Sequence, residues 1–160
     1  AHPESAEILR RNFSYIFNDE NHYTGFKPKL SLTEVDTESF EVAGMRIQPF
    51  DLEHGGIRVM GIRIGDFAYA TDCNSIPPES MSVLDGVRVL IIDALRHREH
   101  TSHFTVEQAL EIVDVLKPEK TYLTHTNYEL EYHETNRHLP EGVELAYDGL
   151  CLDINPGAGS

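Results

Sequence analysis

The sequence lacks tryptophan and contains only two cysteines, Cys73 and Cys151, among its 160 residues. Two cysteines cannot build a disulfide framework, and such low cysteine use is typical of a reducing compartment. A membrane-spanning helix needs roughly 20 apolar residues in succession, whereas apolar runs here are short, as at residues 89–92. We therefore expect a cytoplasmic protein without a membrane partner.

Positive charge is also scarce. Lysine and arginine number 13 against 27 aspartate and glutamate residues, so the formal net charge is −14 with histidine neutral. An acidic surface repels phosphates, which argues against a nucleic-acid backbone as partner unless a bound cation intervenes. Nine histidines supply candidate ligands for such a cation.

The length and the hydrophobic content of 40% indicate one globular domain over residues 1–160. The chain opens Ala-His-Pro-Glu without an initiator methionine, and residues 155–160 are interpreted as a flexible tail or a remnant of cloning. We therefore expect an excerpt of a longer protein.

The pattern of apolar residues predicts alternating helices and strands. The clearest helix is expected over 106–116, where Thr105 and Gln108 form a capping box and Pro118 ends the helix. Other helices are expected at 3–17, 77–84 and 129–138, strands at 30–35, 40–42, 45–52, 59–64, 67–71, 87–92 and 121–124, and a closing hairpin at 143–147 and 150–154. This order predicts an α/β fold with a mixed sheet and helices on its faces.

Three potential metal ligands, His54, Asp72 and His125, fall where expected strands end. Sheets of this kind place ligand sites along the carboxyl edge of their strands, so we expect the three side chains to converge. Two imidazoles and a carboxylate suit zinc, iron or manganese, and one carboxylate can bridge two cations. Each residue alone also has a simpler interpretation: a turn cap for Asp72, an exposed hairpin residue for His54 and a core histidine for His125.

Three further histidines, His97, His100 and His103, follow the apolar strand that leads to Asp93. On spacing alone, His97 and His100 are interpreted as residues of a solvated loop. His103 stands two residues before the Thr105 cap, where the free N–H groups of a helix start attract anions, so it is a candidate to hold a phosphate or to protonate a leaving oxygen. Asp93 is left open between a buried turn residue and a site residue.

Four segments carry a resemblance to a known family. They are Leu-Glu-His-Gly at 52–55, Tyr-Ala-Thr-Asp-Cys-Asn-Ser-Ile-Pro at 69–77, Leu-Thr-His at 123–125, and the run over 139–149. In order and spacing they resemble the metallo-β-lactamase-fold hydrolases, in particular the branch that includes phosphoribosyl cyclic phosphodiesterase. The resemblance implies a four-layer αβ/βα sandwich with a dinuclear metal site at one edge of its sheets.

The resemblance also implies residue roles. His54 is then a terminal ligand of one metal ion, Asp72 bridges two ions, and His125 is a ligand of the other. Zinc is the expected metal, with manganese or iron as alternatives. His103 matches the histidine at the substrate phosphate, and we place His100 beside it as a second substrate-binding residue. The implied activity is hydrolysis of a small phosphodiester-type substrate by metal-activated water, with His103 as the catalytic side chain.

The family's H-x-H-x-D-H segment, which belongs to the first half of its fold, is missing from this sequence. We therefore expect the chain to be the second half of such an enzyme, truncated and inactive or weakly metal-binding alone. Half a sandwich leaves an apolar sheet face exposed, so the expected partner is the missing first half or a second copy in a homodimer.

Two other functions stay open on sequence alone. A non-catalytic acidic binding module would carry incidental or pH-sensing histidines. A metal-dependent hydrolase of thioesters or lactams would use the same fold, since one fold hosts many chemistries. Melting that responds to a chelator favours either hydrolase over the binding module.

Overall fold

The computed structural model of the protein describes residues 1–18 and 25–154. The contacts divide the chain into two compact units, Ala1–Glu38 and Ser39–Ser160, and each is described by itself. The prediction of one domain over residues 1–160 stays a prediction, and the tail expected at 155–160 lies outside the described residues.

The first unit begins with two helices, α1 (Pro3–Asn12) and α2 (Ser14–Phe17). Pro3 suits the first turn of α1, because the N–H group that proline lacks would have no partner inside the helix there. The prediction of one helix over 3–17 is wrong at Phe13, whose φ of −118° and ψ of 39° interrupt the helical backbone.

The strand predicted at 30–35 is not formed. Instead, the terminal ammonium group of Ala1 donates to the carbonyl oxygen of Thr33 at 2.7 Å, and the N–H of Val35 donates to the carbonyl oxygen of Ala1 at 2.9 Å. The segment thus bonds to the chain terminus and not to a neighbouring strand, and alternating apolar residues form a strand only where a partner strand completes the ladder.

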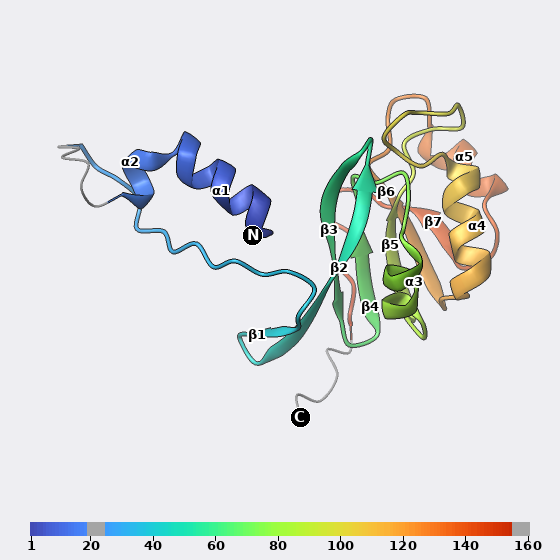
Figure 1. Ribbon diagram of the computed structural model, residues 1–160. Coiled ribbons are helices and arrows are strands. Elements are labelled where there is room, and N and C mark those ends of the chain that lie inside the picture. The colour runs from blue at the N-terminus through green and yellow to red at the C-terminus, as the bar shows by residue number, and fades with distance from the viewer. Residues whose placement is uncertain (19–24, 155–160) are drawn as a thin grey trace. The chain divides into compact units, whose positions relative to one another are not determined.

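The second unit is built on one seven-stranded mixed sheet, whose strands lie side by side in chain order (Figure 1). Strands β1 to β4 pair antiparallel, and β4 to β7 pair parallel. The strands are β1 (Phe40–Val42), β2 (Met45–His54), β3 (Ile57–Ile64), β4 (Phe67–Ala70), β5 (Val89–Asp93), β6 (Lys120–Thr124) and β7 (Val143–Leu145).

Three helices connect the parallel strands: α3 (Pro78–Leu84), α4 (Val106–Leu116) and α5 (Tyr132–His138). Parallel neighbours need such crossover connections, and all three helices lie on the same face of the sheet (Figure 1). The predicted α/β fold with a mixed sheet and helices on its outer face is confirmed. No helix of the described residues is long and apolar enough to cross a membrane.

The core lies between the sheet and these helices. Alternate residues of adjacent strands fill it, and Leu52, Leu90, Ile92 and Leu123 have no exposed surface. Phe50 packs its ring over the opposite residue Gly61, where an added Cβ atom would lie 2.3 Å from the ring. Because side chains alternate across a strand, the neighbouring residues belong to the other face of the sheet.

That other face is also apolar. One row of register partners across the strands consists of Pro49, Ile62, Tyr69, Ile91 and Tyr122. Ile62, Tyr69 and Ile91 are only half-buried. Helices α3, α4 and α5 do not contribute to this face, because they all cover the opposite one (Figure 1).

Helix α4 has the ends that the sequence predicted. The hydroxyl oxygen of Thr105 accepts the N–H of Gln108 at 3.1 Å, and the side-chain oxygen of Gln108 accepts the N–H of Thr105 at 2.9 Å. The helix ends at Leu116, where Lys117 adopts the left-handed conformation with φ of 50°. The cap anchors the loop that carries His103 just before it.

The closing hairpin predicted at 143–147 and 150–154 is wrong in its second strand. Strand β7 ends at Leu145, and residues 150–154 form no strand. A turn does form, because the N–H of Leu150 donates to the carbonyl oxygen of Tyr147 at 3.1 Å with Gly149 at φ of +90°. Strand β7 instead pairs in parallel with β6, and no ladder continues beyond the turn.

Candidate metal centre

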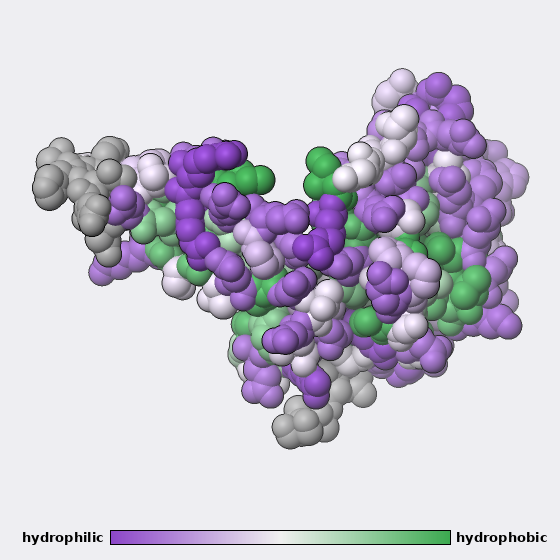
Figure 2. Space-filling model, in the orientation of Figure 1, coloured by the Kyte–Doolittle hydropathy of each residue, from purple (hydrophilic) through white to green (hydrophobic). Residues whose placement is uncertain are grey.

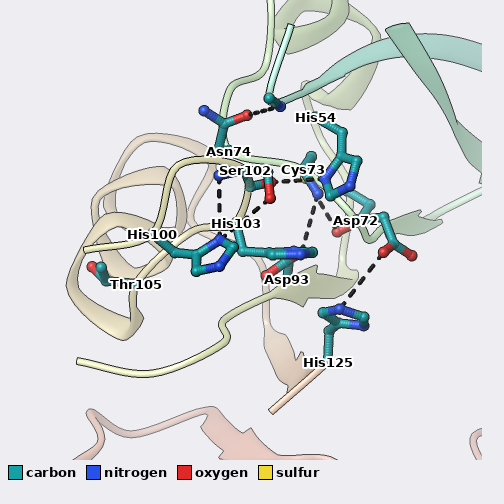
Figure 3. A network of polar contacts seen from close by, with 12 residues as sticks. His54, Asp72, Cys73, Asn74, Asp93, His100, Ser102, His103, Thr105 and His125 are labelled. Atoms are coloured by element: carbon teal, nitrogen blue, oxygen red, sulfur yellow. Dashed lines mark hydrogen bonds and ion pairs between the residues drawn. The ribbon is translucent and has the colours of Figure 1, made fainter. Parts of the chain in front are cut away.

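Imidazole and carboxylate side chains gather at the carboxyl edge of the sheet. Asp93 ends β5, Asp72 follows β4, and His125 follows β6 directly. Strand β2 runs in the same direction as β4, since each pairs antiparallel with β3, so His54 at the end of β2 reaches the same edge. His103 approaches from the loop before α4, and the five side chains form one network (Figure 3).

His54 is oriented by a backbone group. Its Nδ1 lies 2.8 Å from the carbonyl oxygen of Ser102. A carbonyl oxygen only accepts, so Nδ1 carries the proton and Nε2 keeps its lone pair available for a ligand. Metal-ligating histidines are typically held in this way by a bond from their other ring nitrogen.

Asp72 and His125 approach each other from neighbouring loops. His125 Nε2 lies 3.6 Å from Asp72 Oδ1 (Figure 3). Bonds of about 2.0–2.2 Å to zinc place two ligand atoms of a tetrahedral ion roughly 3.3–3.5 Å apart, so this spacing suits a shared cation.

Both residues adopt left-handed backbone conformations, with φ of 55° for Asp72 and 60° for His125. Aspartate and histidine are among the side chains found most often in this region apart from glycine. The conformation turns the chain sharply at the end of each strand. Two non-glycine residues with this geometry at one edge mark a place where the fold holds a costly backbone conformation.

His103 stands at the centre of the cluster. Its ring centroid lies 4.5 Å from that of His125, 4.7 Å from that of His54 and 5.0 Å from that of His100. The side chain is nearly buried, and its Nδ1 lies 2.8 Å from Asp93 Oδ2. His103 is thus in contact with the predicted ligands on both sides.

Asp93 is the buried support of His103. It has no exposed surface, and its Oδ2 also accepts the N–H of Cys73 at 3.0 Å. Burial raises the pKa of Asp93, although the hydrogen bonds from His103 and Cys73 oppose this effect. The other carboxylate oxygen, Oδ1, is buried without a hydrogen-bond partner among the described residues.

At this edge, two overlapping groups of side chains have donor atoms within 4.8 Å of one another. One consists of His54, Asp72 and His103, and the other of Asp93, His103 and His125. Neutral imidazole nitrogens and carboxylate oxygens are the donors that zinc, manganese and iron accept, so the chemistry of this donor set fits a divalent ion. Cys73 is outside both groups, and burial followed by the charges of Asp93 and Asp72 raises the pKa of its thiol, which keeps it protonated.

The two remaining histidines of the loop, His97 and His100, differ in their surroundings. His100 is exposed, and its Nδ1 accepts the N–H of Ser102 at 3.3 Å while its ring lies beside His103. Desolvation, followed by the charges of His103 and Arg96, lowers the pKa of His100. His97 turns away and pairs with Glu107 at 2.6 Å, as expected for a residue of a solvated loop.

The structure therefore brings together all five residues predicted for the site, His54, Asp72, His100, His103 and His125. Their roles as ligands and substrate contacts stay predictions. The sequence context of Asp93 is compatible with a buried turn residue or a site residue, and nothing in the sequence marks Asn74, which joins two loops of the site. A charged residue that ends a fully apolar strand was the signal available for Asp93, whereas no sequence pattern marks a bridging asparagine.

The model of the Beta-lactamase superfamily domain matches residues 1–126, and the chain belongs to this family. The fold is accordingly the metallo-β-lactamase fold, as the resemblance implied. This fold implies the use of divalent metal ions, and His54, Asp72 and His125 at the carboxyl edge are candidate ligands for them.

Two solved structures of similar proteins support this assignment of the fold. The crystal structure of a new diphosphatase from the PhnP family is 37% identical, with a TM-score of 0.83 over 94% of this chain and 55% of that chain. Zinc-bound PqqB from Methylobacterium extorquens is 16% identical, with a TM-score of 0.69 over 96% of this chain and 64% of that chain, and shows the fold alone.

Among curated proteins, the chain is 34% identical over 147 residues to an octanoyltransferase of Porphyromonas gingivalis (strain ATCC BAA-308 / W83). That match covers 90% of this chain and 30% of the relative. The chain thus spans about half the length of the diphosphatase structure and less than a third of the octanoyltransferase.

Proposed function

We propose that the chain is part of a metal-dependent hydrolase of small phosphodiester-type substrates. The observation that carries the proposal is the meeting of His54, Asp72 and His125 around the buried pair of His103 and Asp93. The 37% identical diphosphatase supports a phosphoester substrate over other substrates of the fold.

The donors would serve two ions. His54 would hold one ion, His125 the other, and Asp72 both, since a carboxylate has two oxygens to share. Zinc fits this set best, with manganese or iron as alternatives. Such ions lower the pKa of a bound water to near neutrality and stabilise negative charge on the phosphoryl oxygens.

His103 acts on the substrate through its Nε2. Asp93 accepts a hydrogen bond from the Nδ1–H of His103. This bond fixes the tautomer and leaves Nε2 to face a phosphoryl group or leaving oxygen. When protonated, Nε2 donates a hydrogen bond to a phosphate oxygen or a proton to the departing alkoxide. His100 lies beside this ring and, with its lowered pKa, is neutral near pH 7 and suited to a hydrogen bond with the same group.

The chain in isolation is incomplete as an enzyme. It spans 55% of the diphosphatase structure and lacks the H-x-H-x-D-H segment, whose histidines and aspartate would add further metal ligands. We expect weak metal binding and no turnover from the chain alone. Free Cys73 and Cys151 agree with the reducing cytoplasm as the predicted location.

Zinc titration of the purified chain tests the metal site. Wild-type protein is expected to bind Zn²⁺, and His125→Ala to lose at least about tenfold in affinity, because a ligand has gone. His138→Ala is the matched control, since His138 is an exposed histidine paired with Glu134 on α5. Equal affinity in wild type and His125→Ala would contradict the proposed site.

The reaction is tested with the purified protein encoded by the longest open reading frame that contains this sequence. With Zn²⁺ or Mn²⁺ it is expected to hydrolyse bis(p-nitrophenyl) phosphate, and His103→Ala to slow hydrolysis by about 10²- to 10⁴-fold, the usual range for a general acid. An acyl thioester is the comparison substrate. Turnover of the thioester without turnover of the phosphodiester would replace the phosphodiesterase by an acyl hydrolase.

We also propose what covers the half-buried apolar face of the sheet. In the longer protein the remainder of the fold would pack on this face, and for the chain alone a second copy would do so. Sedimentation at micromolar concentration is expected to show a dimer, which Ile62→Glu in the centre of the face disrupts. Val115→Glu, at an exposed position on α4, is the control, and a wild-type monomer would contradict this partner.

A further inference from the structure

We propose that Asn74 is a positioning residue that sets the spacing between His54 and His103. It does not belong to either donor group and acts through the loops that carry the two histidines. The inference rests on the proposed function only in its metal-binding consequence, because the spacing itself can be measured without metal.

The side-chain amide of Asn74 joins two loops. Its Oδ1 accepts the N–H of Gly55, directly after His54, at 2.9 Å (Figure 3), and its Nδ2 donates to the carbonyl oxygen of Thr101, two residues before His103, at 3.3 Å. One group must accept and donate at once. Only a carboxamide side chain offers both a strong acceptor and a strong donor on one planar group of this size.

The two loops touch where Asn74 joins them. His54 Nδ1 donates to the carbonyl oxygen of Ser102, and a Cβ atom added to Gly55 would lie 2.9 Å from Ser102 Cβ. Gly55 thus permits a backbone approach that a larger residue would prevent, and its φ of +57° also favours glycine. The result is the 4.7 Å separation between the rings of His54 and His103.

The backbone places Asn74 before its side chain acts. Left-handed Asp72 turns the chain out of β4, and the next residues run beside the end of β2. There the N–H of Asn74 donates to the carbonyl oxygen of Glu53 at 2.8 Å, and the N–H of Glu53 donates to the carbonyl oxygen of Ser75 at 3.0 Å. Truncating the side chain leaves these bonds intact, so its effect falls on the loops and not on the fold.

A matched asparagine lies elsewhere in the chain. The Oδ1 of Asn136 accepts the N–H of Leu145 at 2.8 Å and so joins α5 to β7. The bond resembles that of Asn74 to Gly55 in chemistry and length, but neither element carries a predicted site residue. Asn136→Ala therefore reports what the loss of such a bond costs without any effect on the site.

The first measurement uses nitrogen-15 NMR of the imidazole rings in the metal-free chain. Asn74→Ala is expected to shift the ring signals of His54 and His103, whereas Asn136→Ala leaves both unchanged. Asn74→Asp keeps an acceptor for Gly55 but loses the donor to Thr101, so it is expected to shift His103 more than His54. Unchanged His54 and His103 signals in Asn74→Ala would overturn the inference.

The second measurement is Zn²⁺ titration with melting temperatures recorded on the same samples. Asn74→Ala is expected to bind Zn²⁺ about 10-fold more weakly than wild type, the lower end of the range for outer-sphere changes, with a melting temperature close to that of Asn136→Ala. Equal Zn²⁺ affinity in the two variants would overturn the metal-binding consequence. Failure of wild type itself to bind Zn²⁺ would count against the proposed function, and the NMR result would still decide the role of Asn74.

Discussion

The two edges of the sheet use charged side chains in opposite ways. At the amino edge, Arg88 before β5 donates to Glu119 before β6 through two nitrogens, at 2.8 and 2.6 Å, and to Asp66 in the β3–β4 turn at 3.0 Å. At the carboxyl edge, imidazoles and carboxylates face one another around His103. One edge neutralises its charges with its own side chains, whereas the other collects donor atoms that fit a divalent cation.

The face of the molecule in the space-filling view is largely hydrophilic, with apolar residues scattered over it (Figure 2). Hydrophilic surface is therefore not what distinguishes a site in this protein. What distinguishes the carboxyl edge is the combination of converging donors, left-handed backbone at Asp72 and His125, and the buried carboxylate of Asp93.

Among these substitutions, Asp72→Asn is expected to have the largest effect on the difference between the two edges, because it removes cation binding at the carboxyl edge. It replaces the shared carboxylate by a neutral amide, and Zn²⁺ affinity should fall by more than about 100-fold, beyond the range for outer-sphere residues. Asparagine tolerates the left-handed conformation as well as aspartate does, so the melting temperature should stay near that of wild type. Titration calorimetry and a thermal melt on one preparation check both, and full Zn²⁺ affinity in this variant would remove Asp72 from the site.

Substitution of Asp93 tests how much the buried hydrogen bonds of the carboxyl edge contribute to stability. Asp93→Ala leaves the buried N–H of Cys73 and the ring of His103 without their acceptor, which should cost about 1–3 kcal/mol of unfolding free energy. Asp93→Asn keeps an oxygen acceptor and should cost less. Urea denaturation of both variants measures the difference, and equal costs would show that these hydrogen bonds add little to the stability of this edge.

Glu119→Gln tests the amino edge and should have the smallest effect. The bonds from Arg88 hold the pKa of Glu119 below its ordinary value. A lowered folded-state pKa stabilises the protein above the unfolded-state value, near pH 4.3, and this contribution disappears as the pH falls through the folded-state pKa.

Melting temperatures across the pH range check this sign. Wild type should melt slightly above Glu119→Gln at pH 6–8, and the difference should vanish in acid. Zn²⁺ affinity should be the same in both proteins at neutral pH, because Glu119 lies at the edge opposite the donors. A difference that grows in acid would contradict the role of Arg88.

Several elements were predictable because their signals are local. The capping box of Thr105 and Gln108 defines the start of α4, and short apolar runs define β5 and β6. The alignment of His54, Asp72 and His125 followed from one rule, that strands of like direction end at one edge. Local failures have a common cause: residues 30–35 and 150–154 have strand-like composition, yet among the described residues neither segment pairs with a strand.

The sequence by itself determined the family, the α/β layering and the residue types of the site. Residue identity sets the donor chemistry, and the spacing of apolar residues sets the order of helices and strands. Only the tertiary structure decided that His103 belongs to both donor groups, that Asp93 supports it from a fully buried position, and that Asn74 joins its loop to that of His54. These relations depend on hydrogen bonds between segments distant along the chain, and such bonds exist only once the sheet has brought the strand ends together.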